Sequence, residues 1–76
     1  MNKTRRKYLQ SVGQQLEELR DRLEELLADE EEALQNTPEN LQKSERYECD
    51  QNRLTEMEYA LCGIEDAISS IESAAE

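Results

Sequence analysis

The spacing of the apolar residues limits the folds open to this chain more than any other feature. In the first half these residues follow one another at alternating steps of three and four, the a/d spacing of a coiled-coil seam. They are Leu9, Val12, Leu16, Leu19, Leu23 and Leu26. Strong helix formers with polar side chains fill most positions between them. We therefore expect one long helix over residues 3–35, with Leu27 and Leu34 beside its seam.

The second half repeats this rhythm. The same steps join Tyr47, Asp50, Leu54, Met57, Leu61, Ile64, Ile68, Ile71 and Ala75. Three alanines flank the series at seven-residue spacing, namely Ala60, Ala67 and Ala74. These positions predict a second helix over residues 45–73.

Residues 36–44 are predicted to form the joint. Pro38 ends the first helix because it biases the preceding residue toward extended geometry. Ser44 is a residue type that caps helix N-termini. Helices of nearly equal length with a short joint predict an antiparallel hairpin. The expected fold is an all-α, antiparallel two-helix coiled coil that forms a single domain over residues 1–76.

The two predicted seams can be matched to each other. In an antiparallel pair, the residue numbers of facing positions have a constant sum. A sum of 80 aligns six layers, from Leu9 opposite Ile71 to Leu26 opposite Leu54. The same register places Glu30 opposite Asp50, a repelling pair that would suit a cation or an arginine of a partner. In the alternative, which we favour, the first helix drifts off its repeat, so that Leu27 and Leu34 point inward and Glu30 points outward.

Composition argues against several classes of function. The 76 residues carry a net charge of −10, from 19 acidic and 9 basic side chains, and include no His. No run of about 18 apolar residues exists, which argues against a membrane span or a membrane partner. A chain this short rarely forms a closed pocket, and this one lacks the usual general base. We therefore expect no enzyme, no catalytic residue and no cofactor.

The two cysteines do not suggest a metal or redox site. Cys49 and Cys62 lie 13 residues apart on the predicted second helix, roughly 20 Å and beyond disulfide reach within one chain. Neither has a His partner or a CxxC spacing, so no metal site is expected. With no secretion signal in the N-terminal segment, we expect reduced thiols and a cytoplasmic location.

The charge is unevenly distributed along the chain. Residues 1–16 hold four bases and no acid, whereas residues 17–76 hold all 19 acids and five bases, giving +4 and −14. The basic segment Lys3–Lys7 is suited to nucleic acid or another anionic surface, or is a solvated, frayed terminus. The strongly acidic remainder disfavours direct nucleic-acid binding.

Most acids of the first helix lie on its predicted outer face. Together with two residues of the second helix they form the candidate partner-binding set, Glu17, Glu18, Asp21, Glu24, Glu25, Glu31, Glu32, Tyr59 and Asp66. Carboxylates along a rod, about two per 5.4 Å turn, resemble the charge spacing of a phosphate backbone and fit a basic nucleic-acid channel on another protein. The alternative is that these acids only keep a coiled coil in solution. Tyr59 is likewise either a contact residue or simply an exposed side chain.

A lone hairpin buries its apolar stripes on one side only. Chains below about 70–80 residues seldom gain more than about 3–5 kcal/mol from a single core. The extra apolar width from Leu27, Leu34 and the flanking alanines therefore predicts a second contact, most simply a homodimer that forms a four-helix bundle. Coverage of that surface by a different protein is the alternative.

The joint region also carries a resemblance. The segments Asn36–Glu48 (NTPENLQKSERYE) and Ile64–Ile68 (IEDAI) are similar to those of small acidic helical-hairpin proteins carried by phages and mobile elements of gut bacteria. The similarity covers roughly residues 20–75, and these relatives often have Gly where this chain has Lys43. The resemblance implies an accessory role in a bacterial host cell, and inhibition of host defence is a recurring use of small acidic phage proteins. It assigns no activity to any named residue.

The sequence as a whole thus predicts a non-enzymatic protein whose acidic surface docks on a host protein with a basic surface. A nucleic-acid-binding defence protein, as in anti-CRISPR inhibition, is the more specific expectation. The rival function is a structural or regulatory homo-oligomer whose charges only solubilise it.

Overall fold

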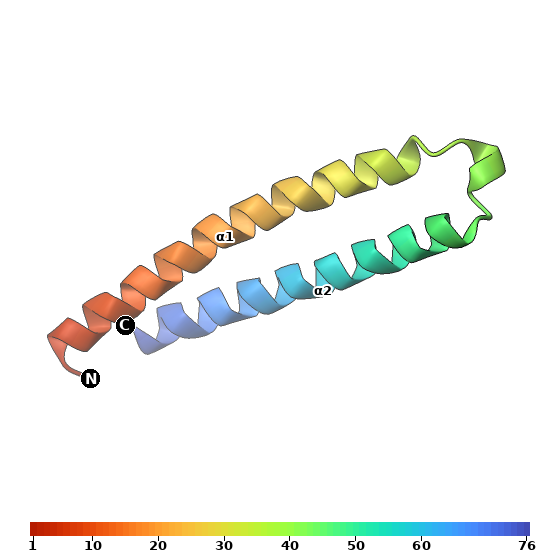
Figure 1. The fold of residues 1–76 in the computed structure, drawn as a ribbon. Helices are drawn as coiled ribbons and strands as arrows, with labels where there is room; N and C mark the ends of the chain where they lie inside the picture. The colour runs from red at the N-terminus through yellow and green to blue at the C-terminus, as the bar shows by residue number, and fades with distance from the viewer.

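The computed structural model describes residues 1–76 as two long α-helices packed side by side in an antiparallel hairpin (Figure 1). α1 spans Lys3–Gln35, the 3₁₀ turn η1 spans Glu39–Leu41, and α2 spans Glu45–Ala74. The molecule is a rod of 59 × 15 × 13 Å whose two chain ends lie at the same tip. The predicted all-α hairpin is confirmed, and only the end of α2 differs from its predicted bounds, by one residue.

Each long helix begins at a side-chain cap. Asn2 Oδ1 accepts a hydrogen bond from the Arg5 amide at 2.8 Å, and Ser44 Oγ accepts one from the Tyr47 amide at 3.2 Å. The Ser44 hydroxyl also donates to the Leu41 carbonyl at 2.7 Å, which ties α2 to the preceding turn. These bonds satisfy amides that the start of a helix leaves without a partner. The predicted cap at Ser44 is confirmed.

The seam of α2 is the predicted one. Its half-buried and buried positions include Tyr47, Asp50, Leu54, Met57, Leu61, Ile64, Ile68, Ile71 and Ala75. Ile68, at 5% exposure, is the most completely buried large side chain of the molecule. Asp50 is half-buried and forms an ion pair with Arg53 at 3.6 Å.

The seam of α1 differs from the predicted one. The residues turned toward α2 at steps of three and four are Leu9, Gly13, Leu16, Arg20, Leu23, Leu27, Glu30 and Leu34. Val12, Leu19 and Leu26, which we expected in the seam, are instead 45%, 48% and 57% exposed. The residue that follows each of these three takes its place, so α1 is turned about its own axis relative to the prediction.

The register between the helices is shifted as well. A Cβ atom placed on Gly13 would lie 3.2 Å from Ile71 Cγ2, so these two residues face each other. Facing positions therefore sum to 84 rather than to the predicted 80. The same sum places Leu16 opposite Ile68 and Leu23 opposite Leu61.

The course of the joint accounts for this shift. After α1 the chain continues along the rod through Pro38, which is extended at φ −57° and ψ 143°, before η1 turns it back (Figure 1). The tip of the hairpin therefore falls near Gln42 instead of Asn40. Gly13, in addition, leaves room for the β-branched Ile71 side chain.

The shifted register also decides between the two arrangements considered for Glu30. Leu27 and Leu34 point inward, as the drift of the first helix predicts, but Glu30 is half-buried rather than outward. With a sum of 84, Glu30 lies opposite Leu54, and Asp50 lies opposite Leu34. The two carboxylates are therefore not paired across the seam, and Asp50 has Arg53 as its partner.

The core between the helices is thin. Only three of the 76 residues are buried, namely Gly13, Ile68 and Ala75, and the accessible surface totals 6144 Å². The long faces of the rod, rather than an interior, therefore hold most of the side chains available for function.

Candidate functional site

The antiparallel pairing sorts the residues beside the seams onto two sides of the hairpin. In an antiparallel pair, a two-fold axis perpendicular to the helices relates one helix to the other. Residues that occupy the same position relative to the seam on α1 and on α2 therefore lie on the same side of the hairpin. One side receives the residues that follow Leu9, Leu16 and Leu23 on α1. The other side receives those that precede Gly13 and Arg20. The two sides differ completely in chemistry.

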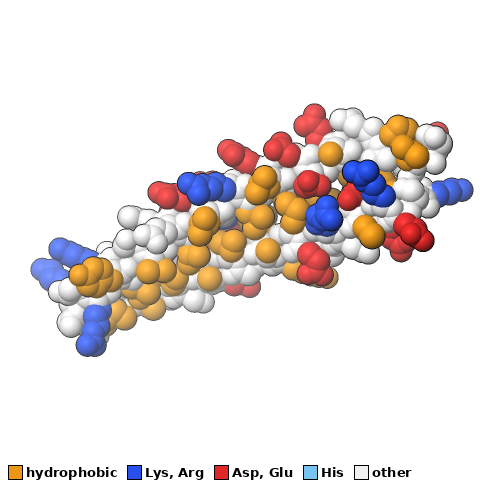
Figure 2. Space-filling model, viewed as in Figure 1, with side chains coloured by type: hydrophobic (Ala, Val, Ile, Leu, Met, Phe, Trp, Pro, Cys, Tyr) orange, Lys and Arg blue, Asp and Glu red, His pale blue; other side chains and the backbone are white.

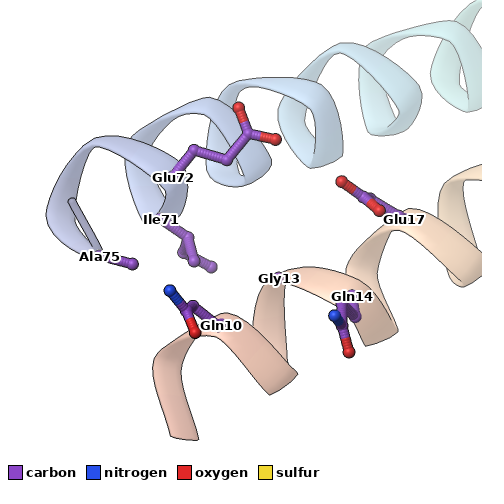
Figure 3. A pocket seen from close by; sticks show the side chains of 7 residues that line it. All are labelled: Gln10, Gly13, Gln14, Glu17, Ile71, Glu72 and Ala75. Carbon is purple, nitrogen blue, oxygen red and sulfur yellow. The ribbon is translucent and has the colours of Figure 1, made fainter. Parts of the chain in front are cut away.

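The first side is acidic over most of its length. Its residues, which we call the acidic edge, are Glu17, Glu24 and Glu31 from α1 and Glu58, Glu65 and Glu72 from α2. Glu17 and Glu72 line the same shallow hollow of about 270 Å³ beside Gly13 and Ile71 (Figure 3). The close-up thus places acids from both helices on one side of the seam.

The predicted partner-binding acids of α1 divide between two rows. Three of them belong to the acidic edge, Glu17, Glu24 and Glu31. The others stay exposed on the outer side of α1, namely Glu18, Asp21, Glu25 and Glu32. Figure 2 shows acidic side chains along that outer side. The outer stripe expected from the sequence is therefore shifted around α1, because the turned seam brings Glu17, Glu24 and Glu31 to the side next to α2.

The carboxylates of the acidic edge have no cationic partner within the chain. The structure contains two ion pairs, Arg20 Nη2 to Asp21 Oδ1 at 3.3 Å and Arg53 Nη1 to Asp50 Oδ1 at 3.6 Å. Both pairs join residues close in sequence, and neither includes a member of the edge. The edge therefore presents an unneutralised negative field, which attracts basic groups of another molecule.

The second side is apolar from the free ends of the rod to beyond its middle. Its residues, which we call the apolar face, are Val12, Leu19 and Leu26 from α1 and Ala60, Ala67 and Ala74 from α2. Figure 2 shows hydrophobic side chains gathered in a band along both helices on the side in view. The sequence shows the seven-residue spacing of the three α1 residues but predicts them in the seam, whereas the structure places them beside it.

The two remaining candidate residues lie elsewhere. Tyr59, 67% exposed, and Asp66 lie on the side of α2 that faces away from α1, as the sequence predicts. They belong to neither the acidic edge nor the apolar face. Cys49 and Cys62 are free and exposed. The basic segment Lys3–Lys7 forms the first turns of α1, and all of its residues except Arg6 are exposed.

The joint has a hollow of its own. It measures about 470 Å³ and is lined by Thr37, Pro38, Leu41, Ser44, Arg46, Tyr47 and Asp50. No group of three or more His, Cys, Asp and Glu side chains in the chain is arranged to hold a metal ion. The two long sides of the rod are therefore the candidate sites with the clearest chemistry.

Comparison with known proteins adds no relative. No protein-family model matches the chain, and neither curated proteins nor solved structures yielded a match. Neither helix contains an apolar stretch long enough to cross a membrane. The argument for a function therefore starts from the acidic edge and the apolar face.

Proposed function

We propose that this protein is a non-enzymatic binding protein whose acidic edge docks on a basic surface of a host macromolecule. The observation that carries the proposal is the row of six carboxylates along one side of a rod, none of which has a cationic partner in the chain. Neutralising such a row intramolecularly would need only a few Lys or Arg residues on the same flank. Docking on a basic surface supplies those charges from outside.

The alignment of the acids in rows supports a partner that normally holds nucleic acid. Within each helix the edge carboxylates recur every seven residues, about 10 Å apart. The outer row of α1, at Glu18, Glu25 and Glu32, adds a parallel line of charge. Nucleic-acid-binding proteins line a groove with Lys and Arg that neutralise phosphates, and rows of carboxylates can pair with the same basic groups. A rod 15 × 13 Å across is slender enough to lie in such a groove.

The proposed setting is the cytoplasm of a bacterial host, with a nucleic-acid-binding defence protein as the inhibited target. This part of the proposal rests on the resemblance of the joint, Asn36–Glu48, to small proteins of phages and mobile elements. In this setting the acidic edge competes with the nucleic acid for the basic groove of the target.

The experiment is affinity purification from a bacterial lysate followed by binding measurements on the identified partner. The edge variant combines Glu17→Gln, Glu24→Gln, Glu58→Gln and Glu65→Gln. The matched control removes the same charge elsewhere, with Glu39→Gln, Glu48→Gln, Glu56→Gln and Glu76→Gln. We expect the edge variant to bind at least about tenfold more weakly, and wild-type binding to fall by a similar factor between about 0.1 and 0.5 M NaCl. Equal binding by the edge variant and the control would refute the role of the acidic edge.

The exposed apolar face favours a second candidate, a structural or regulatory homo-oligomer. We propose a homodimer that forms a four-helix bundle as the working form in either case, because three buried residues make a small core for 76. Thermal melting distinguishes this form from a stable monomer, since the melting temperature of a dimer rises with protein concentration. If binding to a basic partner is absent while the dimer persists, the structural function is favoured over docking.

A further inference from the structure

We propose that the apolar face binds the apolar face of a second copy in one specific orientation. The two hairpins are related by a two-fold axis parallel to the rod, so that α1 of each copy packs on α2 of the other and both joints lie at the same end. This inference rests on the proposed homodimer, and it adds the contacting face and the direction of the two-fold axis.

The exposed area is the first argument for a second copy. A compact chain of 8.9 kDa is expected to expose about 4,800 Å², whereas this chain exposes 6144 Å². The difference, about 1,300 Å², exceeds the roughly 800 Å² that each partner buries in a standard interface. One long face of the 59 × 15 Å rod offers roughly 900 Å², enough for such an interface.

The side chains on α2 form a receiving groove. A row of small residues follows the apolar flank of this helix at steps of three and four, namely Ala60, Gly63, Ala67, Ser70 and Ala74. A Cβ atom on Gly63 would meet nothing within 4 Å, so packing inside the hairpin gives no reason for glycine at this position. Glycine in a helix interior costs about 1 kcal/mol relative to alanine. Close approach of another helix explains its presence.

The matching ridge lies on α1 of the same chain. Val12, Leu19 and Leu26 are large, exposed and spaced at seven residues along the flank that shares a side with the alanines. With seam positions that sum to 84, the nearest flank positions on this side sum to 86, which places Val12 beside Ala74, Leu19 beside Ala67 and Leu26 beside Ala60. One face thus carries a ridge and a groove side by side, which is the requirement for a self-complementary two-fold contact.

The direction of the axis follows from this arrangement. A two-fold axis along the rod places the ridge of each copy over the groove of the other at every layer. An axis across the rod would place ridge against ridge and groove against groove, which leaves one half of the interface crowded and the other half hollow. Interaxial distance depends on the side chains at the contact, and large residues over small ones allow a uniform spacing of about 8–10 Å.

Electrostatic repulsion between the acidic edges also favours the apolar face as the contact between two copies. The acidic edge lies on the opposite side of each hairpin, so pairing through the apolar faces keeps the six glutamates of both copies apart and open to a partner. Pairing through the acidic edges would bring twelve carboxylates together, which is strongly unfavourable. The dimer therefore leaves the surface of the proposed function free.

Sedimentation equilibrium of purified protein tests the contacting face. We expect wild type at twice the 8.9 kDa chain mass, and at least a tenfold weaker dimer for Leu19→Glu and for Gly63→Leu. Gly63→Leu is informative because leucine raises helix propensity and its Cβ atom would meet nothing within 4 Å in the hairpin, so we expect the variant to fold while its groove is filled. Tyr59→Glu, on the outer side of α2, is the matched control and is expected to leave the dimer intact. Dimers unaffected by both face variants would show that another surface is used.

Distances between spin labels test the orientation. Asn40→Cys in a Cys49→Ser, Cys62→Ser chain provides one label at each joint. With the axis along the rod the two labels lie within about 30 Å, because helix spacings are about 10 Å. With the axis across the rod they lie apart by most of its 59 Å length. A dimer with the long distance overturns this inference and leaves the homodimer standing. A monomer overturns both, while the glutamine variants test docking separately.

Discussion

Gly13 shows how one position sets the distance between the helices. It is buried in α1, and Ile71 Cγ2 lies 3.2 Å from where its Cβ would be. Ile71 is β-branched, so Cγ2 is attached directly to Cβ and moves only with χ1 or with the backbone. Glycine here costs about 1 kcal/mol in helix propensity, but its small size allows the approach that half-buries Ile71. Gly13 is therefore a packing position, despite the low helix propensity of glycine.

The substitution Gly13→Ala is expected not to recover that propensity. The added methyl group overpacks the contact with Ile71, which typically costs about 1–3 kcal/mol. The free energy of unfolding should therefore stay unchanged or fall by up to about 2 kcal/mol. In an Ile71→Ala background the same change should raise it by about 1 kcal/mol. Urea denaturation of the four proteins measures the coupling.

Gly63→Ala is the control for this cycle, because a Cβ atom there meets nothing within 4 Å. At protein concentrations where the hairpin is monomeric, we expect it to stabilise the chain by about 0.5–1 kcal/mol. Equal stabilisation by the two alanine substitutions would contradict the contact between Gly13 and Ile71.

At the scale of the element, α1 contains two overlapping apolar series and α2 contains one. Leu9, Leu16 and Leu23 belong to both series of α1. The apolar stripe of α1 can be completed either by Val12, Leu19 and Leu26 or by Leu27 and Leu34. α2 makes the choice, since the joint sets which residues of α1 lie opposite its isoleucines. The helix ends, by contrast, follow from local bonds at Asn2 and Ser44.

Removing the cap of α2 is expected to lower stability. In Ser44→Ala the Tyr47 amide loses its acceptor, and the Leu41 carbonyl loses a donor at 2.7 Å. Loss of an N-cap costs about 0.5–2 kcal/mol. Ser44→Asp keeps the acceptor and favours the helix dipole, so it should retain most of the stability. Thermal melts followed by circular dichroism provide the measurement.

Ser11→Ala is the matched control for the cap, since Ser11 is exposed within α1. It should be neutral or slightly stabilising, because alanine has the higher helix propensity. A Ser44→Ala protein as stable as Ser11→Ala would mean that the capping bonds contribute nothing.

At the scale of the whole molecule, pairing the helices separates the charge from the apolar residues. Six glutamates gather on one side of the rod, and three large apolar residues with three alanines gather on the other. Six of the 19 acids therefore lie where like charges face each other across the seam. No ion pair along the acidic edge offsets this repulsion.

Relieving this repulsion is expected to stabilise the rod. Glu65 of α2 lies across the seam from Glu17, because flank positions on this side sum to 82 when seam positions sum to 84. Glu65→Lys replaces a repulsion by an attraction and should add about 0.2–1 kcal/mol at low salt, as exposed ion pairs do. Raising NaCl toward about 0.5 M should stabilise wild type and reduce the advantage of the variant. Melting temperatures over a salt series measure both effects.

Glu18→Lys is the control for this reversal, since it changes the net charge equally on the outer side of α1. It should give a smaller gain. If the two reversals stabilised the protein equally, general charge reduction would explain the effect, and the opposition of Glu17 and Glu65 would be disproved.

Most of the fold could be predicted from the sequence, because its signals are local. Apolar spacing indicates two helices, Pro38 and Ser44 mark the joint, and the seam of α2 has no competing series. The candidate site was predicted only in part. Glu18, Asp21, Tyr59 and Asp66 are exposed as expected, whereas Glu17 and Glu24 lie beside α2. A rotation of α1 by a fraction of a turn changes which acids border the seam, and no local signal sets that rotation.

Residue type and short-range spacing are enough to predict the two helices, the antiparallel hairpin and the excess of acid. The outward position of Val12, Leu19 and Leu26, and the register in which facing seam positions sum to 84, are set when the two helices pack. Spacing alone leaves both apolar series of α1 open, because they share Leu9, Leu16 and Leu23. The extended Pro38 segment and the contact of Gly13 with Ile71 act between helices, and they select one of the two.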